Sequence, residues 1–85
     1  MRYTVLWVRR AEEDLAAIWT NAANRNAIAS AANTIDAVLR EDPESRGESR
    51  QGALRILFVP PLGVDFEVFE EDRLVRVLGV WTIKS

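Results

Sequence analysis

The sequence contains no cysteine and no histidine among its 85 residues. The absence of cysteine excludes disulfide bridges and thiolate metal sites. The absence of histidine removes the commonest general base and the commonest metal ligand, and it excludes a Ser-His-Asp triad. The sequence also lacks a phosphate-binding loop, a dinucleotide-binding glycine motif and a nucleophile elbow. We therefore expect no metal site and no other cofactor.

Long apolar runs are also missing. No stretch approaches the roughly 20 consecutive apolar residues that a membrane-spanning helix needs. The apolar run near the N-terminus, Tyr3–Val8, is too short for the apolar core of a signal peptide, and no small-residue cleavage site follows it. These absences predict a protein without membrane association, and the expected location is the cytoplasm.

The charge balance is slightly acidic. Eleven Lys and Arg residues stand against 13 Asp and Glu residues, which gives a formal net charge of −2. A general nucleic-acid binder usually has a basic surface, so this balance argues against one. The apolar fraction is 48%, with three Trp and three Phe, which is enough for a packed core. At this length, we expect a single domain over residues 1–85.

Two amphipathic segments between residues 11 and 39 predict a pair of helices folded back on each other. In both, apolar residues recur at the i, i+3, i+4, i+7 spacing that forms one stripe on a helix. The acidic run 12–14 is expected in the first turn, where it suits the helix dipole better than a metal site. Asn24 is the predicted N-cap of the second helix, which is expected to run to Arg40 and to be stopped by Pro43. The two apolar stripes are Ala11, Leu15, Ile18, Trp19 and Ala22, and Ile28, Ala31, Ala32, Ile35, Val38 and Leu39.

The rest of the chain predicts strands at 3–8, 53–59, 64–69 and 74–81. The first strand is apolar on both faces, so we expect it to be buried on both sides and to end at Arg9 and Arg10. In the third strand, Val64, Phe66 and Val68 alternate with two acidic residues and are expected to point inward.

Three connections join these segments. Residues 60–63 and 70–73 are predicted turns. The polar stretch 41–52 is a predicted loop, either a plain connector or a contact for a partner. The predicted fold is therefore α+β, in the order β-α-α-β-β-β, with a helical hairpin on one face of a small, mainly antiparallel sheet. The opposite face of the sheet would be partly open to solvent and available for a site.

Arginines are the remaining candidates for chemistry. If Asp65 and Glu67 point to the open face, Arg55 and Arg76 would flank them from the neighbouring strands. These guanidinium groups would then contact phosphate, or they would form cross-strand pairs with the carboxylates. We favour the pairs, because the acidic residues would repel a phosphate backbone. Trp81 would stack on a base or lie in the core, and we favour the core.

The chain as a whole resembles the RelE/ParE superfamily of type II toxin–antitoxin toxins, also known as plasmid stabilisation proteins. The resemblance implies the β-α-α-β-β-β fold and a bacterial toxin that inhibits growth. It also implies a cognate antitoxin, whose flexible C-terminal segment wraps around the toxin and blocks it. The segments that carry the resemblance are 3–7, 11–19, 31–39, 42–43, 52–55, 61–68 and 73–81.

The resemblance covers two kinds of activity. Ribonuclease members such as RelE cut messenger RNA in the ribosomal A site with Lys and Arg of the middle strands, often helped by a Tyr or His near the C-terminus. ParE members instead poison DNA gyrase. In this sequence only Arg55, Arg76 and Lys84 would serve as catalytic residues. The candidates for contacts with a target or partner are Arg50, Arg73 and Trp81.

The sequence departs from the ribonuclease pattern. The basic cluster of the strand after the loop is reduced to Arg55. The start of the next strand, where ribonuclease members usually have an Arg, reads Leu62-Gly63-Val64-Asp65, and the C-terminal end has no Tyr and no His. These differences favour a ParE-like toxin that binds a protein target such as gyrase and is not an enzyme. Two alternatives stay open: a ribosome-dependent mRNA endoribonuclease, and an inactive homologue that only binds the antitoxin.

Overall fold

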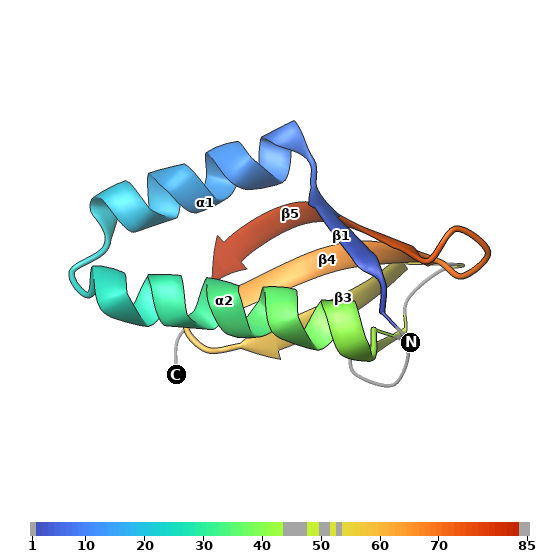
Figure 1. Cartoon of the computed structure of the whole chain (residues 1–85). Helices are drawn as coiled ribbons and strands as arrows, with labels where there is room; N and C mark the ends of the chain where they lie inside the picture. Colours follow the sequence, from blue (N-terminus) through green and yellow to red (C-terminus); the bar gives the residue numbers. More distant parts are fainter. Residues whose placement is uncertain (1, 44–47, 50–51, 53, 84–85) are drawn as a thin grey trace.

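The computed structural model describes residues 2–43, 48–49, 52 and 54–83. Two helices cover one face of a sheet, and the other face is left open (Figure 1). The predicted α+β fold is confirmed. The elements in chain order are β1 (Thr4–Trp7), α1 (Arg9–Asn21), α2 (Arg25–Glu41), β2 (Glu48–Ser49), β3 (Leu54–Val59), β4 (Leu62–Phe69) and β5 (Leu74–Thr82).

The strand order in the sheet is β1-β5-β4-β3-β2. The first and last strands in the chain, β1 and β5, pair in parallel, and all other pairs are antiparallel. The two-residue strand β2 lies inside the loop predicted over 41–52 and pairs with Ile56 and Arg55. This part of the loop prediction is wrong, because two paired residues are too few to leave a periodic signal in the sequence. Residues 44–47 and 50–51 of that loop lie outside the described part.

The helix ends follow local rules, with one difference at the start. The Asn24 side chain accepts a hydrogen bond from the backbone N–H of Ala27 at 3.1 Å, so the predicted N-cap of α2 is confirmed. α1 begins at Arg9 and not at Ala11, and the helical bond from Glu12 N to Val8 O is 3.0 Å. Arginine is a good helix former, and the helix therefore takes up the two arginines that we expected to end the strand.

Strand β1 is buried on one side only. Tyr3 and Val5 are buried under the helices, whereas Thr4 is exposed and Leu6 is 50% exposed. The prediction of burial on both sides is wrong because the helices cover a single face. The turn between β3 and β4 is also shorter than predicted, since Leu62 already pairs with Val59 as part of β4.

The core lies between the sheet and the helices. Val64, Phe66 and Val68 of β4 point into it as predicted, and Phe66 is fully buried. Ile35 and Leu39 of α2 meet them from the helical side and are also fully buried. Within the described residues, neither helix has the length and apolar character needed to cross a membrane.

Candidate functional site

The open face of the sheet has one of the predicted arginine–carboxylate pairs. Arg76 of β5 lies directly across from Glu67 of β4, and their charged atoms are 3.8 Å apart. Both side chains are partly exposed, at 43% and 32%, so solvent screens the attraction and its contribution stays below about 1 kcal/mol. The pair nevertheless places a carboxylate beside the only arginine of β5.

Arg55 does not join Arg76 on this face. The register pairs Arg55 with Phe66, whose side chain points toward the helices, so Arg55 is on the helix-facing side of β3. The β3 residues across from Glu67 and Asp65 are Leu54 and Ile56. The prediction that Arg55 and Arg76 flank the two acidic residues is therefore wrong for Arg55. The candidates Arg50 and Lys84 lie outside the described residues.

Arg73 has a structural contact at the edge of the sheet. It lies in the turn between β4 and β5 with a positive φ of 49°, and its guanidinium is 5.5 Å from the centre of the Tyr3 ring. Its carbonyl oxygen accepts a hydrogen bond from Thr4 N at 2.8 Å. These contacts hold the start of β1 against the β4–β5 turn.

Trp81 lies on the open face and not in the core between sheet and helices, so our preferred prediction for it is wrong. It is paired with Gly63, and a Cβ atom at Gly63 would come within 2.7 Å of the indole Nε1. Phe58 meets Trp81 edge to face, with ring centroids 6.5 Å apart, and is 44% exposed. Only a glycine at position 63 lets the indole lie flat on the strand. Together with Leu6, these rings make the open face apolar and aromatic.

Two carboxylates approach each other across Gly79, next to the irregularity in the β4–β5 register. Asp65 Oδ1 would be 2.8 Å from a Cβ atom at Gly79, and among the described residues it is a buried oxygen without a hydrogen-bond partner. Asp14 Oδ2 of α1 accepts a hydrogen bond from Val80 N at 3.4 Å. No group of three or more metal-ligating side chains occurs in the described part of the chain.

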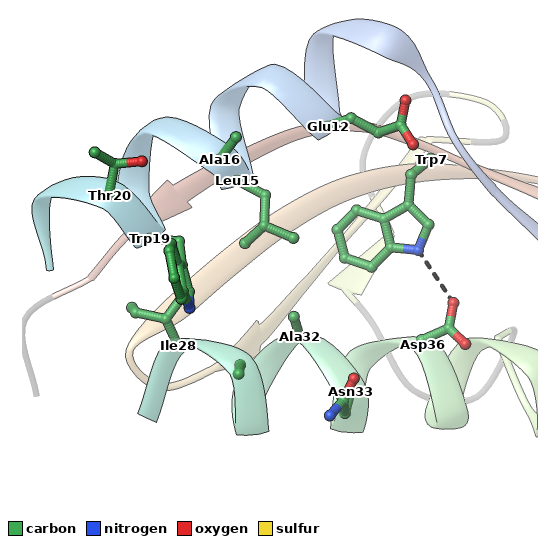
Figure 2. A pocket seen from close by; sticks show the side chains of 11 residues that line it. Trp7, Glu12, Leu15, Ala16, Trp19, Thr20, Ile28, Ala32, Asn33 and Asp36 are labelled. Carbon is green, nitrogen blue, oxygen red and sulfur yellow. Dashed lines mark hydrogen bonds between the residues drawn. The ribbon is translucent and has the colours of Figure 1, made fainter. Parts of the chain in front are cut away.

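A second surface is the groove between α1 and α2, with a volume of about 590 Å³ (Figure 2). At one end, the indole N–H of Trp7 donates to Asp36 Oδ1 at 3.1 Å, and Arg40 donates to Asp36 Oδ2 at 2.7 Å. At the other end, Trp19 is 45% exposed. The lining residues are Trp7, Glu12, Leu15, Ala16, Trp19, Thr20, Ile28, Ala29, Ala32, Asn33 and Asp36.

The sequence did not predict this groove. Trp19 fits the apolar stripe of α1, and we expected it to be covered by the sheet. Instead it stands at the groove, where the Arg25 guanidinium lies 4.6 Å from the centre of its ring and donates to its carbonyl oxygen. Ala16, Ala29 and Ala32 are the signal in the sequence, because small side chains facing each other leave room between two helices.

Solved toxin structures have the same fold. In the RelBE2 toxin–antitoxin complex from Mycobacterium tuberculosis, a chain superposes with a TM-score of 0.76 at 16% identity, over 96% of this chain and 92% of that one. In the chromosomal ParDE system of P. aeruginosa, the values are 0.71 and 19%, over 98% of both chains. The isolated E. coli RelE toxin gives 0.69 and 16%, over 98% of this chain and 86% of that one.

No protein-family profile matches the sequence, and no curated protein matches it either. At identities below 20%, the likeness establishes the fold and leaves the activity to be argued from the residues. RelE and ParE toxins superpose on the chain about equally well, so the superposition does not separate the two kinds of toxin. The chain has the RelE/ParE toxin fold.

Proposed function

We propose that this chain is the toxin of a type II toxin–antitoxin module, that a cognate antitoxin neutralises it, and that it inhibits growth by binding a protein target. The observation that carries the toxin assignment is the match to solved toxins over nearly the whole of both chains. Several of those structures contain the toxin in complex with its antitoxin. A partner of this kind is therefore the first to test.

The open face of the sheet supports a protein target over RNA cleavage. Cleavage of a phosphodiester needs cations placed around the phosphate and a group that moves a proton. Among the described residues, the open face offers Arg76 beside a carboxylate, while Arg55 is on the other side of the sheet. Exposed aromatic side chains such as Phe58 are typical of protein interfaces. DNA gyrase, the target of ParE toxins, is the first candidate.

The alternative of a ribosome-dependent endoribonuclease rests on Arg55, Arg76 and Lys84. A third possibility is an inactive homologue that only binds the antitoxin. Induction of the chain in a bacterial host, with and without the protein of the adjacent reading frame, separates an active toxin from an inactive homologue. Growth arrest that the adjacent protein relieves supports a toxin, and unaffected growth on induction contradicts an active one.

A pair of variants then tests the protein-target proposal. We expect Phe58→Ala to abolish growth arrest, since it removes an exposed ring from the open face, and Arg76→Ala to leave it intact. Primer extension on messenger RNA after induction should show no discrete cuts in the ribosomal A site. Cuts that vanish in Arg76→Ala would establish the endoribonuclease and contradict the protein-target proposal. Inhibition of purified gyrase in a supercoiling assay tests the named target.

A further inference from the structure

The outer edge of β5 loses its neighbouring strand halfway along. β1 pairs with β5 from Leu74 to Val77, and beyond that point no strand of the described residues covers this edge. Helix α1 runs beside the rest of β5 instead (Figure 1). The backbone N–H of Val80 donates to Asp14 Oδ2 of α1 over a long 3.4 Å, which leaves most of the acceptor capacity of this carboxylate unused. A pocket of about 560 Å³ lies here, and we call it the edge pocket.

Asp65 brings a carboxylate oxygen without a donor to the edge pocket. Asp65 pairs with Gly79, and its Oδ1 lies over this glycine, 2.8 Å from where a Cβ atom would be. Asp14 Oδ2 approaches the same point to 3.9 Å from the side of the helix. Asp65 Oδ1 is buried and accepts no hydrogen bond from the described residues. Because a buried carboxylate oxygen without a partner is costly, this place favours a ligand that donates hydrogen bonds.

The charges around the edge pocket select a cation. Its lining has two carboxylates, Asp14 and Asp65, and one guanidinium, Arg10, which leaves one negative charge in excess. Arg10 is exposed and forms no ion pair among the described residues. Arg76, on the same sheet face as Asp65, is paired with Glu67. A phosphate would be repelled by the two carboxylates, whereas a cation would give both of them a partner.

The neighbouring indole narrows the choice of cation. Trp81 lines the edge pocket and pairs with Gly63, so it belongs to the cross-strand pair next to that of Asp65 on the same face. A guanidinium can stack on an aromatic ring and donate several N–H groups to carboxylates at once. A metal ion would find fewer than three ligating side chains among the described residues. The lining therefore fits an arginine side chain better than a metal ion.

We propose that the edge pocket binds an arginine side chain of the protein target, whose guanidinium donates to Asp65 and Asp14 and stacks against Trp81. The target as the source of this arginine rests on the proposed function, whereas the preference for a guanidinium follows from the lining. Trp81 also contacts Phe58, so the edge pocket and the exposed ring of the open face would form one continuous binding surface.

The first experiment tests the edge pocket without any partner. Labelled protein is titrated with N-acetyl-arginine amide, or with its uncharged isostere N-acetyl-citrulline amide, and NMR follows the amides of Gly79 and Val80 and the indole N–H of Trp81. The arginine compound should bind with a Kd on the order of 1 mM, and the citrulline compound should not bind. Asp65→Asn should raise this Kd about tenfold or more, because it removes the charge and keeps the shape. Glu71→Gln, its matched control in the exposed turn before β5, should change the Kd by less than about twofold.

Three results of this titration would overturn the proposal. The first is equal binding of the citrulline compound, or equal affinity of Asp65→Asn and the wild type. The second is binding to Arg10→Ala with none to the wild type, which would assign the edge pocket to the side chain of Arg10 itself. The third is saturation of the same signals by CaCl₂ or MgCl₂ at lower concentrations than the arginine compound, which would assign it to a metal ion. The same spectra show whether each variant is folded.

The second experiment connects the edge pocket with the target. At equal protein levels in a bacterial host, Asp65→Asn should weaken the growth arrest and Glu71→Gln should leave it unchanged. Full arrest by Asp65→Asn would overturn the role of the edge pocket in binding the target and leave the proposed function in place. A wild type without effect on growth would overturn the proposed function and, with it, the target as the source of the arginine, while the titration would still decide whether the pocket prefers a guanidinium.

Discussion

Both sides of the molecule expose an aromatic side chain to about the same extent, but in different surroundings. Trp19 is 45% exposed at a groove between two helices, and Phe58 is 44% exposed on the open face of a sheet. The groove is concave and has two carboxylates at one end, whereas the sheet face is lined by strands and has an ion pair between Arg76 and Glu67. A concave surface encloses more of a bound group than a flat one does, so equal exposure does not make the two surfaces equivalent.

The largest expected effect on stability comes from removing a phenylalanine ring from one face of the sheet and comparing it with the same change on the other face. Phe66 is fully buried against the helices, and Phe58 is on the open face. Phe66→Ala should lower the free energy of unfolding by about 3–5 kcal/mol, because it removes a core ring and leaves a cavity. Phe58→Ala should cost about 1 kcal/mol or less. Urea unfolding followed by circular dichroism measures both, and similar losses would contradict the assignment of the two faces.

A smaller effect is expected at Gly63, on the open face. A Cβ atom there would lie 2.7 Å from Nε1 and 2.8 Å from Cε2 of Trp81. Gly63→Ala should therefore push the indole off the strand, separate it from Phe58, and cost about 1–3 kcal/mol in the free energy of unfolding. The double variant Gly63→Ala/Trp81→Ala is the control. The destabilisation caused by Gly63→Ala should largely vanish when the ring of Trp81 is absent. A destabilisation that persists would point to strain in the backbone at position 63.

The inner face of β4 could be predicted from the sequence, but the inner face of β3 could not. In β4 the apolar residues Val64 and Phe66 alternate with acidic ones, and only one set of side chains can be buried. In β3 both alternating sets contain large apolar residues, so the period alone does not decide which set faces the helices. The short turn at 60–61 fixes the register with β4, and this register puts Arg55 on the helix side.

The groove escaped prediction for a different reason. The periodicity of α1 identifies an apolar stripe, but the sheet covers only the part of it that includes Ala11, Leu15 and Ile18. Whether Trp19 is covered depends on the distance between α1 and α2, which is set by tertiary packing. The sequence predicted features that depend on one local contact, such as the N-cap formed by Asn24. It did not predict the groove, whose shape depends on how two helices pack against each other.

Loss of the hydrogen bond at the polar end of the groove should lower the free energy of unfolding by about 1 kcal/mol. Trp7→Phe keeps an aromatic ring but removes the N–H that donates to Asp36 Oδ1 at 3.1 Å in a partly buried position. Trp19→Phe is the matched control in the other half of the groove, where the indole N–H has no partner among the described residues, and its cost should be smaller. Thermal unfolding of both variants measures the difference. Equal costs would mean that the bond contributes nothing beyond the packing of the ring.

The smallest expected effects on stability come from breaking one ion pair on each side of the molecule. On the open face, Arg76 and Glu67 are 3.8 Å apart, and at the groove Arg40 and Asp36 are 2.7 Å apart with similar exposure. Arg76→Gln should cost less than about 0.5 kcal/mol, and the cost should disappear in 1 M salt. Arg40→Gln should cost more, because it removes a short charge-assisted hydrogen bond from the carboxylate that also holds Trp7. The reverse order in urea unfolding would show that the charges of the open face are the more strongly coupled, and it would contradict the stronger role assigned to the short hydrogen bond of Arg40.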